Sequence, residues 1–274
     1  MTSLVVRRLL IDLAEPFARD WNGRDAFRTA FFNALSMSFP LGEQFFMDSV
    51  RQGVKTLPEE RRQAFAAEVQ AFVGQEATHR RLHALFNGHL ATQGHVNAWE
   101  DRIRERLKRL QGLDLRHPVA ITAATEHLTA ILADYLLSHP AALEGAEPRL
   151  QTLWQWHSAE ESEHRSTAFD VYLAMGGNHR WRVRWLRVVT TFFLSDLLRQ
   201  TVRNLHHDGR LWQFATWRSG ARFLLGRDGV LRRTFGPWRA YLREGFHPSQ
   251  QDGERGLRWL HDHAAQYRVV GESP

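Results

Sequence analysis

The chain has 274 residues, 43% of them hydrophobic and 24% charged, and it contains no cysteine. This composition is that of a globular protein with a substantial core, and the lack of cysteine excludes disulfides, thiolate metal sites and cysteine nucleophiles. The formal net charge is +6. Residues 180–243 hold 14 arginines against three aspartates, a local net of +11, so the positive charge is regional.

The first residues, MTSLVVRRLLIDLAEPF, have a short apolar run but lack the long hydrophobic region and cleavage site of a signal peptide. No run in the sequence approaches the ~18–20 apolar residues of a membrane-spanning helix. We therefore expect a cytoplasmic protein.

Helical periodicity extends along almost the whole chain, and strand signals are nearly absent. Glycine- and proline-containing breaks predict four long helices, at residues 25–53, 59–92, 118–138 and 148–175. A shorter helix over 95–111 is expected in the connection between the second and third. Pro40 falls inside the first helix and is expected to kink or restart it.

Each long helix has one inward-facing seam, at alternating steps of three and four residues, and polar residues interrupt it where apolar ones precede and follow. These residues are Glu43 in the first helix, Glu76, His79 and His83 in the second, Glu126 in the third, and His157, Glu161 and His164 in the fourth. Buried carboxylates without a cation each cost several kcal/mol, and no arginine or lysine lies near them on the seams. The seams therefore predict bound metal. The alternative is a helical bundle with buried polar networks.

The order of these residues matches a known ligand set. Glu76-x-x-His79 and Glu161-x-x-His164 each place both side chains on one helix face. A glutamate from each of two helices, plus Glu-x-x-His from each of two others, is the ligand set of ferritin-like di-iron and di-manganese bundles. We predict an all-α fold, a ferritin-like four-helix bundle with a long crossover between helices 2 and 3 and with C-terminal accessory helices. Two Fe ions are the expected cofactor, with Mn or a mixed Mn/Fe pair as alternatives.

Three further side chains lie next to these motifs in the sequence. His157, one turn before Glu161, is counted among the metal ligands, and the alternative is that it hydrogen-bonds a ligand. His83 is expected to support a ligand or to line the pocket. Glu160 points about 100° away from Glu161 and is expected beside the ligands or on the surface, although the two could exchange roles.

Five motifs resemble the bacterial family called predicted metal-dependent hydrolases, a ferritin-like group: GEQFF (42–46), EATH (76–79), TEH (125–127), WHSAEESEH (156–164) and FHP (246–248). The resemblance covers roughly residues 20–250 and implies a di-metal bundle. By position it carries the ligand role to Glu43, Glu76, His79, Glu126, Glu161 and His164. The additional histidine, His157, resembles the extra-histidine site of the di-iron arylamine N-oxygenases.

Two kinds of chemistry compete at such a site. Ligands that project from mid-helix into a core exclude water, which favours a di-iron oxidoreductase that activates O2 to oxidise an apolar or amine-bearing small molecule, with an electron donor. The alternative is a di-metal hydrolase that uses a metal-activated water, although hydrolytic sites usually lie at an open mouth of loops. A non-catalytic metal-binding helical protein is the further alternative.

The expected organisation has four parts: an N-terminal segment (1–24), the bundle (25–178), Arg/Trp-rich accessory helices packed on it (179–250) and a C-terminal tail (251–274). Tryptophan and arginine flank a short apolar run in the third part. This pattern also permits contact with an anionic membrane surface through residues 181–245, which would place the protein peripherally at the inner face of the membrane. Nucleic acid would fit the charge, but no nucleic-acid motif is visible and this partner is not expected.

Overall fold

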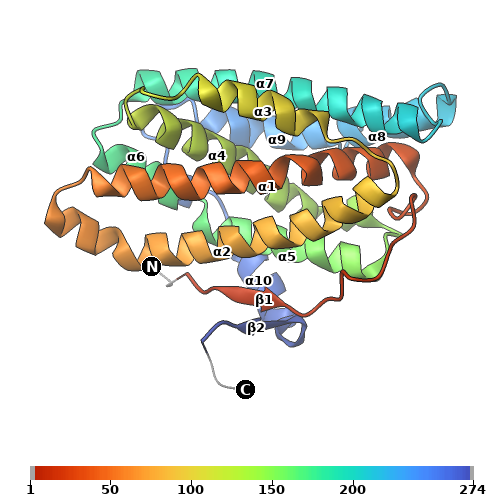
Figure 1. Cartoon of the computed structure of the whole chain (residues 1–274), viewed down its shortest axis with the longest axis horizontal. Helices are drawn as coiled ribbons and strands as arrows, with labels where there is room; N and C mark the ends of the chain where they lie inside the picture. The colour runs from red at the N-terminus through yellow and green to blue at the C-terminus, as the bar shows by residue number, and fades with distance from the viewer. Residues whose placement is uncertain (1–3, 272–274) are drawn as a thin grey trace.

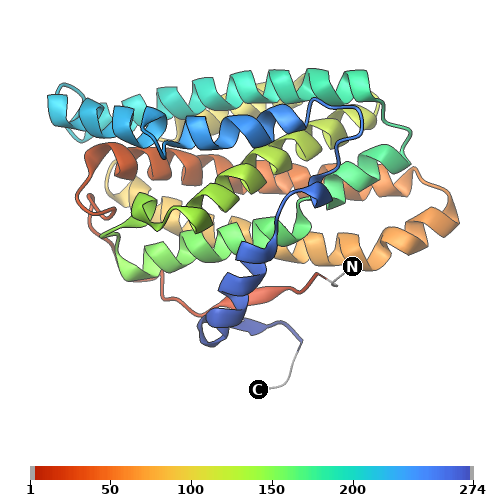
Figure 2. The same ribbon diagram turned by 180° about the vertical axis from the view of Figure 1, so that it is seen from behind.

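The computed structural model describes residues 4–271 and is mostly helical, as expected (Figures 1 and 2). The longer helices are α1 (Ala26–Lys55), α2 (Glu59–Thr92), α4 (Arg116–Ser138) and α7 (His179–His207). The shorter helices are α3 (Ala98–Lys108), α5 (Pro148–His164), α6 (Thr167–Ala174), α8 (Phe214–Leu225), α9 (Val230–Ala240) and α10 (Glu254–Asp262). Two short strands, β1 (Arg7–Leu9) and β2 (Tyr267–Val269), and three short 3₁₀ helices, η1 (Pro140–Leu143), η2 (Pro248–Gln250) and η3 (Ala264–Gln266), complete the elements of residues 4–271.

Helix α1 lies at the centre of the molecule. It packs against α2, α4 and α7, while α4 also packs against α5, α6, α7 and α9. In Figure 1, α3 and α7 lie above α1, and α2 and α5 lie below it. Helix α7 packs against α1 and α4, α8 packs against α1, and α9 packs against α4. No helix within residues 4–271 is long and apolar enough to cross a membrane.

Helix α1 continues through Pro40 from Ala26 to Lys55, so the predicted restart is wrong. A proline has no N–H and leaves the carbonyl four residues before it without its helical partner. That carbonyl belongs to Ser36, and the Asn87 side chain on α2 donates to it through Nδ2 at 2.9 Å. The neighbouring helix thus replaces the hydrogen bond that the proline removes.

The predicted helix over 148–175 is divided, because α5 ends at His164 and α6 begins at Thr167. At this break Arg165 Nη1 donates to the Ser162 carbonyl at the end of α5. The same guanidinium donates to the carbonyl of Pro248 at 3.1 Å and to that of Gln251 at 2.9 Å. This arginine therefore caps the end of α5 and ties it to the segment before α10.

The two ends of the described chain meet in a small sheet below α2 and α5 (Figure 1). Strand β1 is antiparallel to β2, with Arg7 opposite Val269 and Leu9 opposite Tyr267. Gly74 on α2 leaves room for Val6, whose methyl groups occupy the position that a side chain there would take. The sequence predicted no strand in either segment, because three residues are too few to form a periodic pattern.

Candidate metal centre

Four helices bring eight acidic and imidazole side chains to one place in the core. They are Glu43 from α1, Glu76, His79 and His83 from α2, Glu126 from α4, and His157, Glu161 and His164 from α5. None of them is more than 4% exposed. All seven residues that the sequence singled out as ligands thus lie in this cluster, together with His83.

His164 lies among three of the carboxylates. Its Nε2 is 3.0 Å from Glu76 Oε1, 3.3 Å from Glu126 Oε2 and 3.5 Å from Glu161 Oε1. The other ring nitrogen, Nδ1, donates to Gln75 Oε1 at 2.9 Å. This hydrogen bond fixes the ring so that Nε2 faces the carboxylates, where it could bind a metal ion.

His79 is also held by a hydrogen bond on one ring nitrogen, but here Nε2 donates and Nδ1 faces the cluster. Its Nε2 donates to Glu160 Oε2 at 3.0 Å. Its Nδ1 makes no hydrogen bond and lies 3.8 Å from Glu161 Oε1 and 4.0 Å from Glu76 Oε1. A carboxylate that holds one nitrogen of a histidine while the other faces the site is the arrangement common behind metal-bound histidines.

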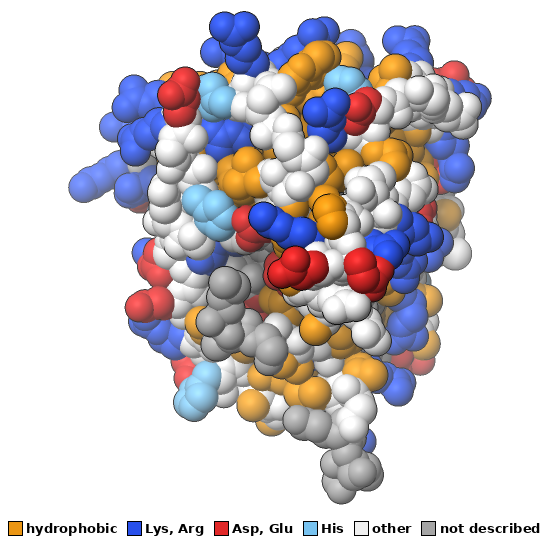
Figure 3. Space-filling view, turned by 90° about the vertical axis from the view of Figure 1, so that its left-hand side faces the viewer, with side chains coloured by type: hydrophobic (Ala, Val, Ile, Leu, Met, Phe, Trp, Pro, Cys, Tyr) orange, Lys and Arg blue, Asp and Glu red, His pale blue; other side chains and the backbone are white. Residues whose placement is uncertain are grey.

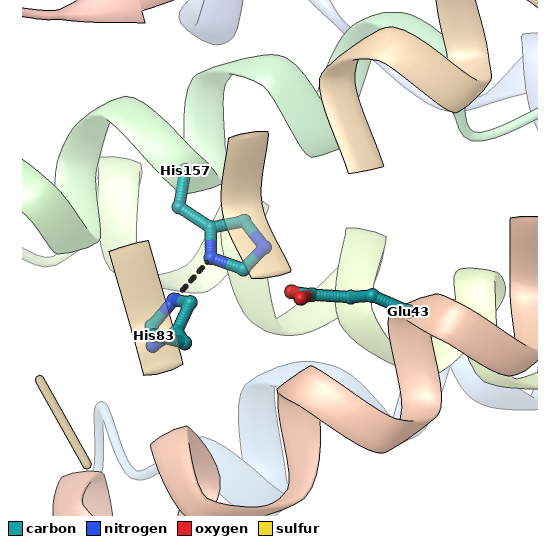
Figure 4. A group of neighbouring side chains, drawn as sticks. All are labelled: Glu43, His83 and His157. Carbon is teal, nitrogen blue, oxygen red and sulfur yellow. Dashed lines mark hydrogen bonds between the residues drawn. The ribbon is translucent and has the colours of Figure 1, made fainter. Parts of the chain in front are cut away.

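The third histidine, His157, is oriented through a chain of four side chains. The Ser36 hydroxyl donates to Asn87 Oδ1 at 2.8 Å, so its oxygen accepts from His83 Nδ1 at 2.9 Å. His83 Nε2 must then accept from His157 Nδ1, 2.7 Å away (Figure 4). The other ring nitrogen of His157, Nε2, consequently faces Glu161 Oε1, at 3.0 Å.

Glu43 approaches the cluster from the opposite helix. Figure 4 shows its carboxylate directed from α1 toward the ring of His157. Ligand atoms of Glu43, Glu76 and His79 lie within 4.8 Å of one another, and so do those of Glu43, His83 and His157. Both carboxylate oxygens of Glu43 are buried and make no hydrogen bond.

Three of the four carboxylates in the cluster make no hydrogen bond within residues 4–271. Both oxygens of Glu76 and Glu126 are also buried without a hydrogen bond. Burial, together with the neighbouring carboxylates, raises the pKa of Glu43 and Glu126 well above the ordinary value. Burial would raise the pKa of Glu161 as well, but His164 and His157 hold it well below. Unpaired buried oxygens beside unpaired ring nitrogens fit a bound divalent metal, and this mixture of carboxylate and imidazole suits Fe or Mn.

Glu160 is fully buried and is not a surface charge. One carboxylate oxygen contacts His79, and the other accepts from Arg7 Nη1 at 3.1 Å. Arg7 also binds both oxygens of Glu163, at 2.6 and 2.9 Å. Glu160 therefore supports His79 from behind, while Glu161 faces the cluster.

Sequence reasoning missed Arg7 and Gln75 as supports of the histidines. The only signal for Gln75 was its place immediately before Glu76, and the structure shows that it is fully buried. Arg7 gave none, since it is 153 residues away from Glu160 along the chain and is placed by the packing of its strand on α2 and by the pairing of β1 with β2.

A family model described as "Predicted metal-dependent hydrolase" matches residues 5–252. The match includes the whole cluster and Arg7. No curated protein and no solved structure matches the chain. The family description and the buried His/Glu groups both support metal dependence. In the choice of chemistry, the description agrees with the hydrolase alternative rather than with the oxidoreductase expected first.

Proposed function

The chain belongs to the predicted metal-dependent hydrolase family, and from this premise we propose that its buried cluster binds two metal ions in a bundle of the ferritin-like kind. The four helices that bring the side chains together are α1, α2, α4 and α5. They correspond to the four helices expected from the sequence, with α3 in the long connection between the second and third.

Two ions rather than one are supported by how the ligand atoms group. Glu43, Glu76 and His79 form one group within 4.8 Å, and Glu76, Glu161 and His164 form another. The two groups share Glu76, which would lie between the ions. Glu126 and His157 complete the proposed ligand set, since each lies beside one of these residues.

We propose oxidation as the reaction, with iron as the first choice of metal and manganese or a mixed pair as alternatives. Bound iron would supply oxidation of the substrate by O2, with electrons from a separate donor. The observation that carries this proposal is the burial of every ligand candidate, each carried by a helix that faces the core rather than by a loop at an open mouth. The chain's own contribution is to exclude water and to hold the three histidine rings in fixed orientations.

Hydrolysis is the second candidate, because the family description favours it. Bound metal would then supply an activated water for attack on an ester or phosphoester. The residues that would hold the metal are the same in both proposals.

One preparation tests both candidates. The metal-free chain is loaded anaerobically with Fe(II), its iron content is measured, and air is admitted while the near-UV and visible absorbance is followed. Two irons per chain and a new absorption band after air would support oxidation. Two metals without a reaction toward O2, or a preference for zinc, would favour hydrolysis. No bound metal would overturn both.

The ligand assignment has its own test. Glu161→Ala and His79→Ala should each lose stoichiometric metal, because each removes a side chain shared by several contacts in the cluster. A matched control is His247→Ala, since His247 ends a third Glu-x-x-His motif but lies partly exposed and contacts Asp170 instead. Two metals per chain in both cluster variants would refute the assignment.

A further inference from the structure

A large apolar cavity lies between α1, α3, α4 and α7. Its volume is about 680 Å³, within the range of sites that hold small-molecule ligands. Its walls include Phe45 and Phe46 from α1, Ile103 from α3, Ile121 from α4, and Val188 and Val189 from α7. Such walls suit a hydrocarbon rather than a polar metabolite.

The cavity comes close to the metal centre at one end. A smaller void of about 20 Å³, room for about one water molecule, is lined by His157 and Glu161. Phe39, Thr129 and Phe193 line both this void and the large cavity. These three side chains therefore lie between the cavity and the cluster.

The opposite end of the cavity is basic. Helices α3 and α7 are antiparallel, because the Trp99 N–H donates to Gln200 while Arg106 binds Asp196, one turn earlier on α7. Arg109, at the end of α3, therefore lies at the same end of the cavity as Arg184, near the start of α7. Figure 3 views this end of the molecule and shows Lys and Arg side chains gathered along its top.

The charges that line the cavity differ in whether they are already paired. Arg102 and Arg106 both bind Asp196, and Glu105 binds Lys108. Within residues 4–271, Arg109 and Arg184 form no ion pair, and Asp101 is the unpaired acid of the lining. The two arginines are thus available to an anion at this end.

We propose that the cavity binds a long-chain carboxylate, with its head group at Arg109 and Arg184 and its tail directed toward Phe193. Arg184 and Phe193 are nine residues apart on α7, which corresponds to ~13 Å of helix. The end of the tail would then be the part nearest the metal centre, which suits oxidation of the chain and not hydrolysis at the head. The reaction depends on the proposed function, but the binding does not.

Binding is tested on the metal-free chain with dodecanoate, and with dodecanol as the uncharged match, by calorimetry and by the fluorescence of Trp99 and Trp185, which line the cavity. Dodecanoate should bind more tightly than dodecanol. The double variant Arg109→Gln/Arg184→Gln should weaken dodecanoate by about tenfold and change dodecanol little, because it removes only the charged contacts. Arg81→Gln, an exposed arginine on α2, is the matched control.

A second variant tests the cavity itself. Gly42 lines it, and a Cβ there would meet only Phe46 Cζ, at an ordinary 3.7 Å, so a larger side chain would extend into the cavity. Gly42→Leu should lose binding of both ligands while its metal content and thermal stability stay those of the wild type. Unchanged binding in Gly42→Leu, or equal binding of dodecanol and dodecanoate, would overturn the proposal.

Two further results separate this proposal from its neighbours. Binding to anionic phosphatidylglycerol vesicles without binding of monomeric dodecanoate would overturn it in favour of membrane-surface contact through residues 181–245. Dodecanoate binding by a chain that takes up no metal would support the cavity proposal and refute the proposed function. Two bound metals per chain without dodecanoate binding would support the proposed function and refute the cavity proposal.

Discussion

His83 Nε2 lies 2.7 Å from His157 Nδ1, and this contact between α2 and α5 determines which nitrogen of His157 faces Glu161. Which nitrogen carries the proton in the His83–His157 contact is set at Ser36. Its hydroxyl donates to Asn87 and so must accept from His83. The Ser36 hydroxyl on α1 thus determines which ring nitrogen of His157 on α5 faces Glu161. His83 has no need to bind metal itself to be important for metal binding.

Ser36→Ala should weaken metal binding by about tenfold without abolishing it, because loss of a group that orients a metal-bound histidine typically has an effect of that size. His83 would lose the acceptor for its Nδ1 and could take either tautomer. Competitive titration against a chelator measures the change. Ser49→Ala is the control, since Ser49 is a buried serine on α1 that contacts Thr122 rather than the histidines. Equal affinity of the two variants would show that the hydroxyl does not orient His157.

Arg7→Gln should destabilise the protein by about 3 kcal/mol, because it leaves Glu160 and Glu163 without their buried cation. Chemical denaturation measures the free energy of unfolding. Arg8→Gln is a close control, because Arg8 is exposed on the same strand. If both variants have the same stability, the ion pairs behind His79 contribute nothing.

Glu43→Gln should make the metal-free chain more stable near neutral pH, by about 1–2 kcal/mol, although it should weaken metal binding. Burial, with the nearby Glu76 and Glu161 carboxylates, raises the pKa of Glu43 well above 4.5. A raised carboxyl pKa means that the folded chain keeps a proton that the unfolded chain loses. The contribution of this proton to the stability of the folded chain is therefore complete below about pH 4.5. It is lost as the pH rises toward the pKa of Glu43 in the folded chain. The difference between wild type and variant should shrink toward about pH 5, and a pH-independent difference would contradict this account.

Metal affinity should rise with pH. In the metal-free chain, burial, with neighbouring carboxylates, raises the pKa of Glu43 and Glu126, so a metal ion must displace protons from them. Calorimetric titration with metal in two buffers of different ionisation enthalpy measures the number released, and we expect about one proton or more per chain at neutral pH. The same apparent enthalpy in both buffers would mean that these carboxylates are already ionised.

The sequence predicted those parts of the site in which the side chains come from the same helix. Glu76 and His79 share a face because they are three residues apart, and Glu161 and His164 share one for the same reason, so the helical period brings each pair to the core. Arg7 could not be predicted, because its place depends on β1 pairing with a strand at the other end of the chain. The end of α5 was missed for a similar reason, since the Arg165 side chain that caps it is held by carbonyls of residues 248 and 251.

The backbone hydrogen bond that α1 lacks at Pro40 also bears on how the protein folds. A helix whose own ladder lacks the bond to the Ser36 carbonyl is incomplete until Asn87 of α2 arrives. The middle of α1 therefore gains its full stability only when the hairpin with α2 has closed, which makes the two helices one cooperative unit in local opening. Backbone amides on both sides of Pro40 should then exchange with solvent together with those around Asn87, rather than fraying from the nearer end of α1.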